Sequence, residues 1–200
     1  MFTIYVVGAS HGKKISRALR RLQGYGTVFQ VCCLCVGGKK FYDLNWPNLN
    51  SLKETDLLLV LPFGNDLIDR NNISRDQFSK IHLTQFQPRP NSYFEERYRV
   101  LESKLNSTVA QVRIISNFFR HFCCDTHFHP GWLGYQNRLN RDLLLRFPTT
   151  AKVKVLDHRG LLGLPYRKAR NVLQYRNLQY DSVHFRDYLP IAKKILESVL

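Results

Sequence analysis

A serine stands at the boundary between an apolar segment and a basic segment near the start of the chain. Val6-Val7-Gly8-Ala9 leads into Ser10, and from there Ser10–Leu22 places apolar and basic residues at helical spacing. A strand followed directly by a helix puts Ser10 at the carboxyl end of the strand, the edge where open α/β sheets bind ligands. The N–H groups of the helix start can stabilise an anion there. The position also suits a helix N-cap, so both roles for Ser10 stay open.

Two further segments carry groups that can polarise a carbonyl. The apolar run Leu57–Leu61 is followed by Gly64-Asn65-Asp66, and an asparagine at the end of a buried strand can donate a hydrogen bond to a developing oxyanion. The same three residues are also common in turns. Gly37 and Gly38 follow another apolar run, where a glycine lets a substrate approach an exposed backbone N–H.

A carboxylate and an imidazole stand close together near the end of the chain. Asp181-Ser182-Val183-His184 places Asp181 and His184 three residues apart in one short segment. Both side chains can turn toward one nucleophile, with the aspartate fixing the tautomer and orientation of the histidine. This spacing is weak evidence by itself.

The elements that must position these residues alternate along the chain. Apolar runs separated by segments long enough for helices predict an α/β domain, three-layered and doubly wound, with a mainly parallel sheet of about five strands and helices on both faces. The expected strands are Thr3–Val7, Val28–Cys35, Leu57–Leu61, Val109–Ile115 and Val153–Leu156. The expected helices are Ser10–Leu22, Phe94–Leu105, Gly131–Arg146 and Asp187–Leu200. Between Asp157 and Tyr180 the pattern predicts a long irregular loop.

Taken together and in order, these segments resemble the sequence blocks of the SGNH, or GDSL-like, hydrolase superfamily. Ser10 stands in the first block, Gly38 or Gly37 in the second, Asn65 in the third, and Asp181 with His184 in the last. The resemblance covers nearly the whole chain and implies a single SGNH domain over residues 1–200, with an SGNH or flavodoxin-like arrangement. The chain departs from the family pattern at Ala9, where an aspartate is usual, and at Phe185, where proline is frequent.

The resemblance implies a serine esterase. His184 would take the proton of Ser10, Ser10 would attack an ester carbonyl, and Asp181 would steady the imidazolium. The oxyanion would lie among the Ser10 N–H, the Gly38 N–H and the Asn65 amide, each donor contributing roughly 3 kcal/mol to lowering the barrier. Because Ala9 lacks the carboxylate that often supports this turn, activity lower than that of family enzymes is expected.

A positive charge of +15 points to phosphate-rich partners or anionic lipid surfaces, or to a solvated basic surface alone. The basic residues singled out for such a surface are Lys13, Lys14, Arg17, Arg20, Arg21, Arg167, Lys168 and Arg170. A weaker resemblance, to esterase domains of retrotransposon-encoded proteins, implies acyl, lipid or acetyl ester hydrolysis coupled to nucleic acid or an anionic membrane. The competing interpretations are an SGNH-like module that only binds RNA or DNA, and a carbohydrate-ester deacetylase.

The cysteines and the N-terminal segment indicate in which cellular compartment the protein is expected. Five cysteines with two adjacent pairs make a poor disulfide framework, which favours a reducing environment. No basic segment precedes the first apolar run, and no apolar run reaches the ~18 residues of a membrane span, so an intracellular, cytoplasmic protein without signal peptide is expected. One cluster of residues could bind a metal ion by its chemistry: His121, Cys123, Cys124, Asp125, His127 and His129. Its spacing matches no common zinc-binding pattern, so no metal and no cofactor is predicted.

Overall fold

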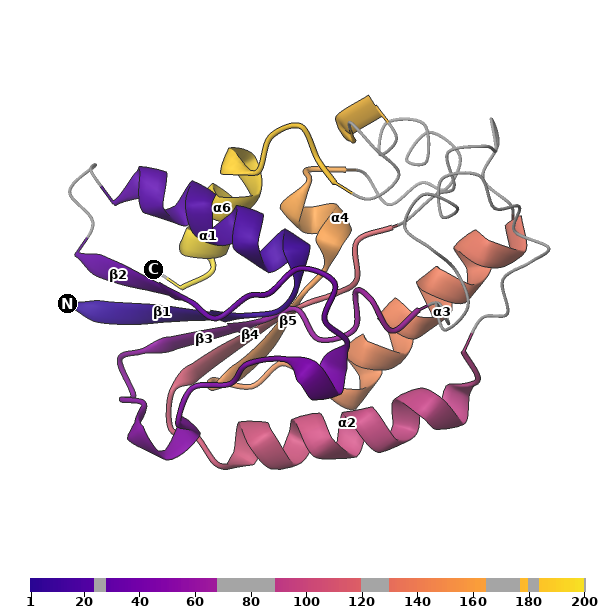
Figure 1. The fold of residues 1–200 in the computed structure, drawn as a ribbon, viewed down its shortest axis with the longest axis horizontal. Helices are drawn as coiled ribbons and strands as arrows, with labels where there is room; N and C mark the ends of the chain where they lie inside the picture. Colours follow the sequence, from indigo (N-terminus) through magenta and orange to yellow (C-terminus); the bar gives the residue numbers. More distant parts are fainter. Residues whose placement is uncertain (24–27, 68–88, 120–129, 165–176, 180–183, 200) are drawn as a thin grey trace.

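A computed structural model describes residues 1–23, 28–67, 89–119, 130–164, 177–179 and 184–199. They form a five-stranded, fully parallel sheet in the order β2-β1-β3-β4-β5 (Figure 1). The strands are β1 Phe2–Val7, β2 Phe29–Cys33, β3 Leu57–Val60, β4 Gln111–Ile115 and β5 Val153–Leu156. The order reverses between β1 and β3, because the chain leaves β1 toward β2 and later returns to the other side of β1. Such a reversal opens a crevice at the carboxyl ends of the two strands.

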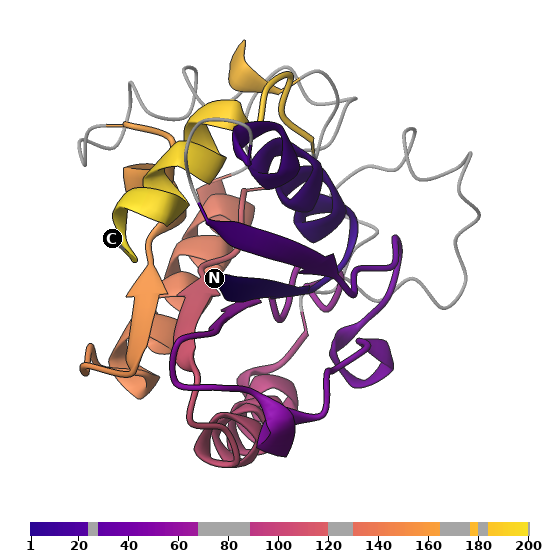
Figure 2. The same cartoon turned by 90° about the vertical axis from the view of Figure 1, so that its left-hand side faces the viewer.

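The helices form one layer on each side of the sheet. The helices α1 Ser10–Leu22, α4 His158–Leu161 and α6 Leu189–Glu197 cover one face, while α2 Asn91–Asn106 and α3 Pro130–Arg146 cover the other (Figures 1 and 2). Short 3-10 turns lie at Phe41–Asp43 and Leu49–Ser51. The three-layer α/β class predicted from the sequence is confirmed.

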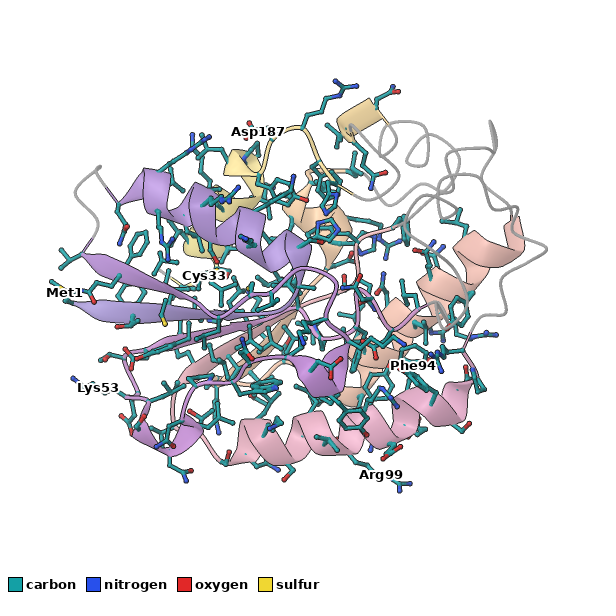
Figure 3. The ribbon with its side chains drawn as sticks, viewed as in Figure 1. Met1, Cys33, Lys53, Phe94, Arg99 and Asp187 are labelled. Carbon is teal, nitrogen blue, oxygen red and sulfur yellow. The ribbon has the colours of Figure 1, made fainter. Side chains whose placement is uncertain are left out.

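Two apolar cores hold these layers together. All four residues of β3 are buried, as expected for a central parallel strand with both faces covered. On the α2 side, Phe94 packs between the helix and the sheet, whereas Arg99 on the outer side of α2 points to solvent (Figure 3). On the other face, Ile15 and Leu19 of α1 pack with Ile191 and Ile195 of α6.

The expected elements agree with the structure apart from their ends and one helix. The range of α1 is the predicted one, and the strands differ from expectation by at most two residues at either end. The loop expected from Asp157 is wrong at its start, because His158–Leu161 forms the short helix α4. Asp157 caps this helix by accepting a hydrogen bond from the Arg159 N–H at 2.9 Å. Residues 165–176 lie outside the described residues.

Candidate functional site

A pocket opens at the carboxyl edge of the sheet, at the reversal of strand order. Its lining comes from the segments after β1, β2, β3 and β4, so residues far apart in the sequence meet at one place. This is the position at which open α/β sheets bind ligands. The lining residues are Ala9, Ser10, His11, Lys39, Leu44, Leu61, Pro62, Gly64, Ile115, Ser116, Asn117 and Phe118.

Ser10 is the first residue of α1, and it lines this pocket. The N-cap of α1 is Ala9, which has no side chain able to cap, so the alternative interpretation of Ser10 as the N-cap is wrong. Ser10 is only partly buried. A serine in the first turn, beside backbone N–H groups that lack helical partners, stands where the helix favours negative charge.

Gly12 brings the start of α1 close to the segment that follows β2. A Cβ on this residue would lie 2.5 Å from Cys35 Sγ, so only glycine permits this approach. Cys35 is buried and donates a hydrogen bond to the Val6 carbonyl. The close packing fixes the helix start that carries Ser10 against two neighbouring strand ends.

Gly38 and Asn65 occupy adjoining turns on this edge. Gly38 has a φ of +79°, a conformation that glycine adopts without strain, and nothing lies within 4 Å of the position of a Cβ. Asn65 is 6% exposed, and its Nδ2 donates to the Lys39 carbonyl at 2.9 Å. The bond ties the turn after β3 to the turn of Gly38.

Asp66, next to Asn65, is an anchor rather than a reacting group. It is 1% exposed and accepts hydrogen bonds from the Phe41 N–H at 2.9 Å, from Tyr93 Oη at 2.8 Å and from Arg97 Nε at 3.3 Å. Burial raises the pKa of this carboxyl, although these donors and the Arg97 charge act in the opposite direction. The carboxylate thereby fixes the segment after β2 to the segment after β3 and to α2.

His184 lies near the start of α1, in contact with the residue that follows Ser10. Its ring centroid is 5.3 Å from that of His11. The Nδ1 of His11 forms a 2.7 Å hydrogen bond with Tyr188 Oη, which also accepts from the Phe185 N–H at 3.3 Å. Tyr188 therefore couples the segment of His184 to α1. His11 and Tyr188 were not identified from the sequence, although His11 adjoins the predicted nucleophile.

The described residues include two members of the predicted triad, Ser10 and His184. Within the described residues Ser10 Oγ makes no hydrogen bond, so the expected contact with His184 is not formed. Hydrogen bonds between catalytic groups often tighten only when substrate is bound. Asp181 lies outside the described residues, as do Arg167, Lys168, Arg170 and the histidine and cysteine cluster at 121–129.

Ser116, Asn140 and His158 form a buried polar network beside the pocket, which the sequence analysis did not predict. Ser116 Oγ lies 2.9 Å from His158 Nδ1 and accepts from the His158 N–H at 2.8 Å. Asn140 Nδ2 lies 3.3 Å from the same nitrogen. Burial lowers the pKa of His158 to about 3, so its imidazole is neutral at neutral pH. The signal in the sequence was Ser116-Asn117 directly after an apolar strand, the pattern already recognised at Ser10 and Asn65.

No group of three or more metal-ligating side chains occurs in the described part of the chain. None of the helices described here is long and apolar enough to span a membrane.

Comparisons with known proteins agree with the fold. No family model and no curated protein matches the sequence. Among solved structures, the chain is similar to an acetyl xylan esterase, with a TM-score of 0.60, 16% identity and full coverage of both chains. It is also similar to a lipase/acylhydrolase from Enterococcus faecalis, with a TM-score of 0.50, 13% identity and coverage of 100% of this chain and 93% of the other. The chain therefore shares the α/β fold of these two solved structures.

Proposed function

We propose that this protein is a serine esterase that hydrolyses acyl, lipid or acetyl esters, with Ser10 as nucleophile, His184 as general base and Asp181 as the residue that orients His184. One observation carries the proposal. Ser10 is the first residue of α1 and lines the pocket at the reversal of strand order, and the ring of His184 contacts that of His11, the residue next to Ser10. The folds of the structural neighbours support it.

The proposed reaction has two steps. His184 takes the Ser10 proton as Oγ attacks the acyl carbonyl, and the Ser10 N–H, the Gly38 N–H and the Asn65 amide stabilise the oxyanion. The ester C–O bond then breaks, and the leaving alcohol takes the proton from His184. In the second step water attacks the acyl-enzyme carbonyl and gives a proton to His184. The bond between the acyl carbon and Ser10 Oγ then breaks, His184 returns the proton to Oγ, and the acid is released. The apolar side chains of Leu44, Leu61 and Phe118 line the pocket and provide a surface for the acyl group.

Turnover of p-nitrophenyl acetate tests the proposal. Wild-type protein is expected to release p-nitrophenol above background, and Ser10→Ala is expected to lower kcat/KM by roughly 10⁴-fold. Ser51→Ala is the matched control, because Ser51 is an exposed serine whose Oγ donates only to the nearby Asn48 carbonyl. Equal turnover by wild type and Ser10→Ala would contradict the assignment.

A second function, binding of single-stranded nucleic acid, is supported by the arrangement of α1 and α6. The two helices lie side by side on one face of the sheet (Figures 1 and 2). Their exposed basic side chains form what we call the α1/α6 basic surface: Lys13, Arg17, Arg20, Arg21, Lys193 and Lys194. No exposed large apolar side chain stands on either helix. Such a surface suits phosphates better than insertion into a membrane.

Charge reversal on this surface tests the second function. Arg17→Glu/Arg21→Glu is expected to weaken binding of labelled single-stranded RNA, measured by fluorescence anisotropy, by at least tenfold. Lys53→Glu/Arg99→Glu is the matched control, because it reverses two exposed charges elsewhere and changes the net charge equally. Equal weakening by both pairs would show that net charge alone matters. Binding to anionic vesicles without binding to RNA would favour a membrane partner.

A further inference from the structure

Asn117 stands at a different strand end from Ser10. It follows β4 by two residues and lines the same pocket as Ser10. The residue is 7% exposed. An amide in such a position gains free energy only where it finds a hydrogen-bond partner, because burial of an unpaired amide is unfavourable.

The main chain of Asn117 is held on both sides by one residue of α3. Its N–H donates to Asn140 Oδ1 at 2.8 Å, and its carbonyl accepts from Asn140 Nδ2 at 2.9 Å. Asn140 is 3% exposed and lies next to His158, within the buried network that includes Ser116. These contacts fix the backbone of Asn117 at the pocket wall.

The side chain of Asn117 is not used by this network. Within the described residues its side-chain amide makes no hydrogen bond. Its oxygen and nitrogen are not fully buried, so both can still reach a partner from outside the protein. A fixed backbone therefore holds an amide, with its donor and its acceptor, in the lining of the pocket. Preorganised polar groups of this kind provide orientation and specificity in otherwise apolar pockets.

We propose that the Asn117 amide is a substrate-contacting residue that selects esters carrying a hydrogen-bonding group next to the reacting ester, such as acylated polyols. The inference rests on the proposed esterase function and adds a substrate class to it. Asn140 acts as a positioning residue, because it holds the main chain of Asn117 without lining the pocket itself, and it lies against His158.

Two probe substrates separate this role from a structural one. Both probes are acetate esters with the same methyl acyl group. They differ on the alcohol side, where glycerol triacetate carries neighbouring ester oxygens and p-nitrophenyl acetate carries an aromatic ring with no hydrogen-bonding group next to the reacting ester. Asn117→Ala is expected to lower kcat/KM about tenfold more for glycerol triacetate than for p-nitrophenyl acetate. Because Asn140 binds only main-chain atoms of Asn117, the variant should keep the wild-type Tm. Asn117→Ser serves as a second variant should Asn117→Ala fold poorly.

The outcomes distinguish the two proposals. If Ser10→Ala abolishes turnover but Asn117→Ala leaves the preference between the two substrates unchanged, the role of Asn117 is overturned and the esterase proposal stands. An equal loss on both substrates by Asn117→Ala would also overturn it, because selection requires a difference. If wild-type protein hydrolyses neither substrate, both proposals fail.

Discussion

Ser10 and Ser116 both line the pocket, and their surroundings give them different roles. Ser116 is 1% exposed, and its oxygen is shared between the backbone and the ring of His158. Although this contact looks like a serine-histidine dyad, an imidazole with a pKa of about 3 is a weak base. Ser10 is partly exposed, at a helix start. The difference depends on burial, which residue types and spacing do not reveal.

The buried imidazole of His158 predicts a loss of stability in acid. Its pKa is about 3 in the folded protein, against an ordinary value near 6.5 in the unfolded chain. The unfolded state therefore binds more protons between these values. The contribution of His158 to the free energy of unfolding is complete above about pH 6.5 and declines as pH falls toward 3, by about 1.4 kcal/mol per pH unit.

Urea unfolding between pH 7.5 and pH 4 measures this contribution. In His158→Gln, which has no imidazole, the free energy of unfolding should fall less steeply with decreasing pH than in wild type. The difference between the two proteins should therefore shrink in acid. Parallel pH profiles would show that His158 is not held neutral.

At the scale of elements, the turn after β3 depends on a buried ion pair. The side chains of Arg97 and Asp66 are 10% and 1% exposed, and Arg97 Cζ also lies 3.3 Å from the centroid of the Tyr93 ring. Asp66→Asn would leave the guanidinium without its carboxylate, so the free energy of unfolding should fall by about 3 kcal/mol. Glu102→Gln, which breaks the more exposed pair with Arg146, should lower the free energy of unfolding far less. Chemical denaturation measures both, and equal costs would contradict the anchoring role of Asp66.

Helices and strands were predictable because their signals are local. Apolar runs and helical spacing located the sheet and α1, whereas α4 was missed because four residues carry too little periodicity. The partners of Asp66 were also beyond prediction, since Phe41, Tyr93 and Arg97 are distant in the sequence and meet it only in the folded chain. The pairing of Asn117 with Asn140 has the same origin. Positions at strand ends could therefore be predicted, but the networks that hold them could not.

At the scale of the whole molecule, the +15 charge is concentrated in part on the α1/α6 basic surface. Neutralising phosphates on single-stranded nucleic acid releases counterions, so the logarithm of the binding constant should fall linearly with the logarithm of salt concentration. Six contacts correspond to a slope of about −4, which titration of labelled RNA at several salt concentrations measures. A slope near zero would contradict binding through this surface.

The most direct test of the central claim is covalent labelling by a fluorophosphonate. An activated serine attacks the phosphorus and expels fluoride, whereas an ordinary serine stays unmodified. Mass spectrometry is expected to show one adduct on the peptide that contains Ser10, no adduct in Ser10→Ala, and wild-type labelling in Ser51→Ala. An unlabelled wild-type protein, or an adduct on Ser116 in place of Ser10, would contradict the assignment of Ser10 as the nucleophile.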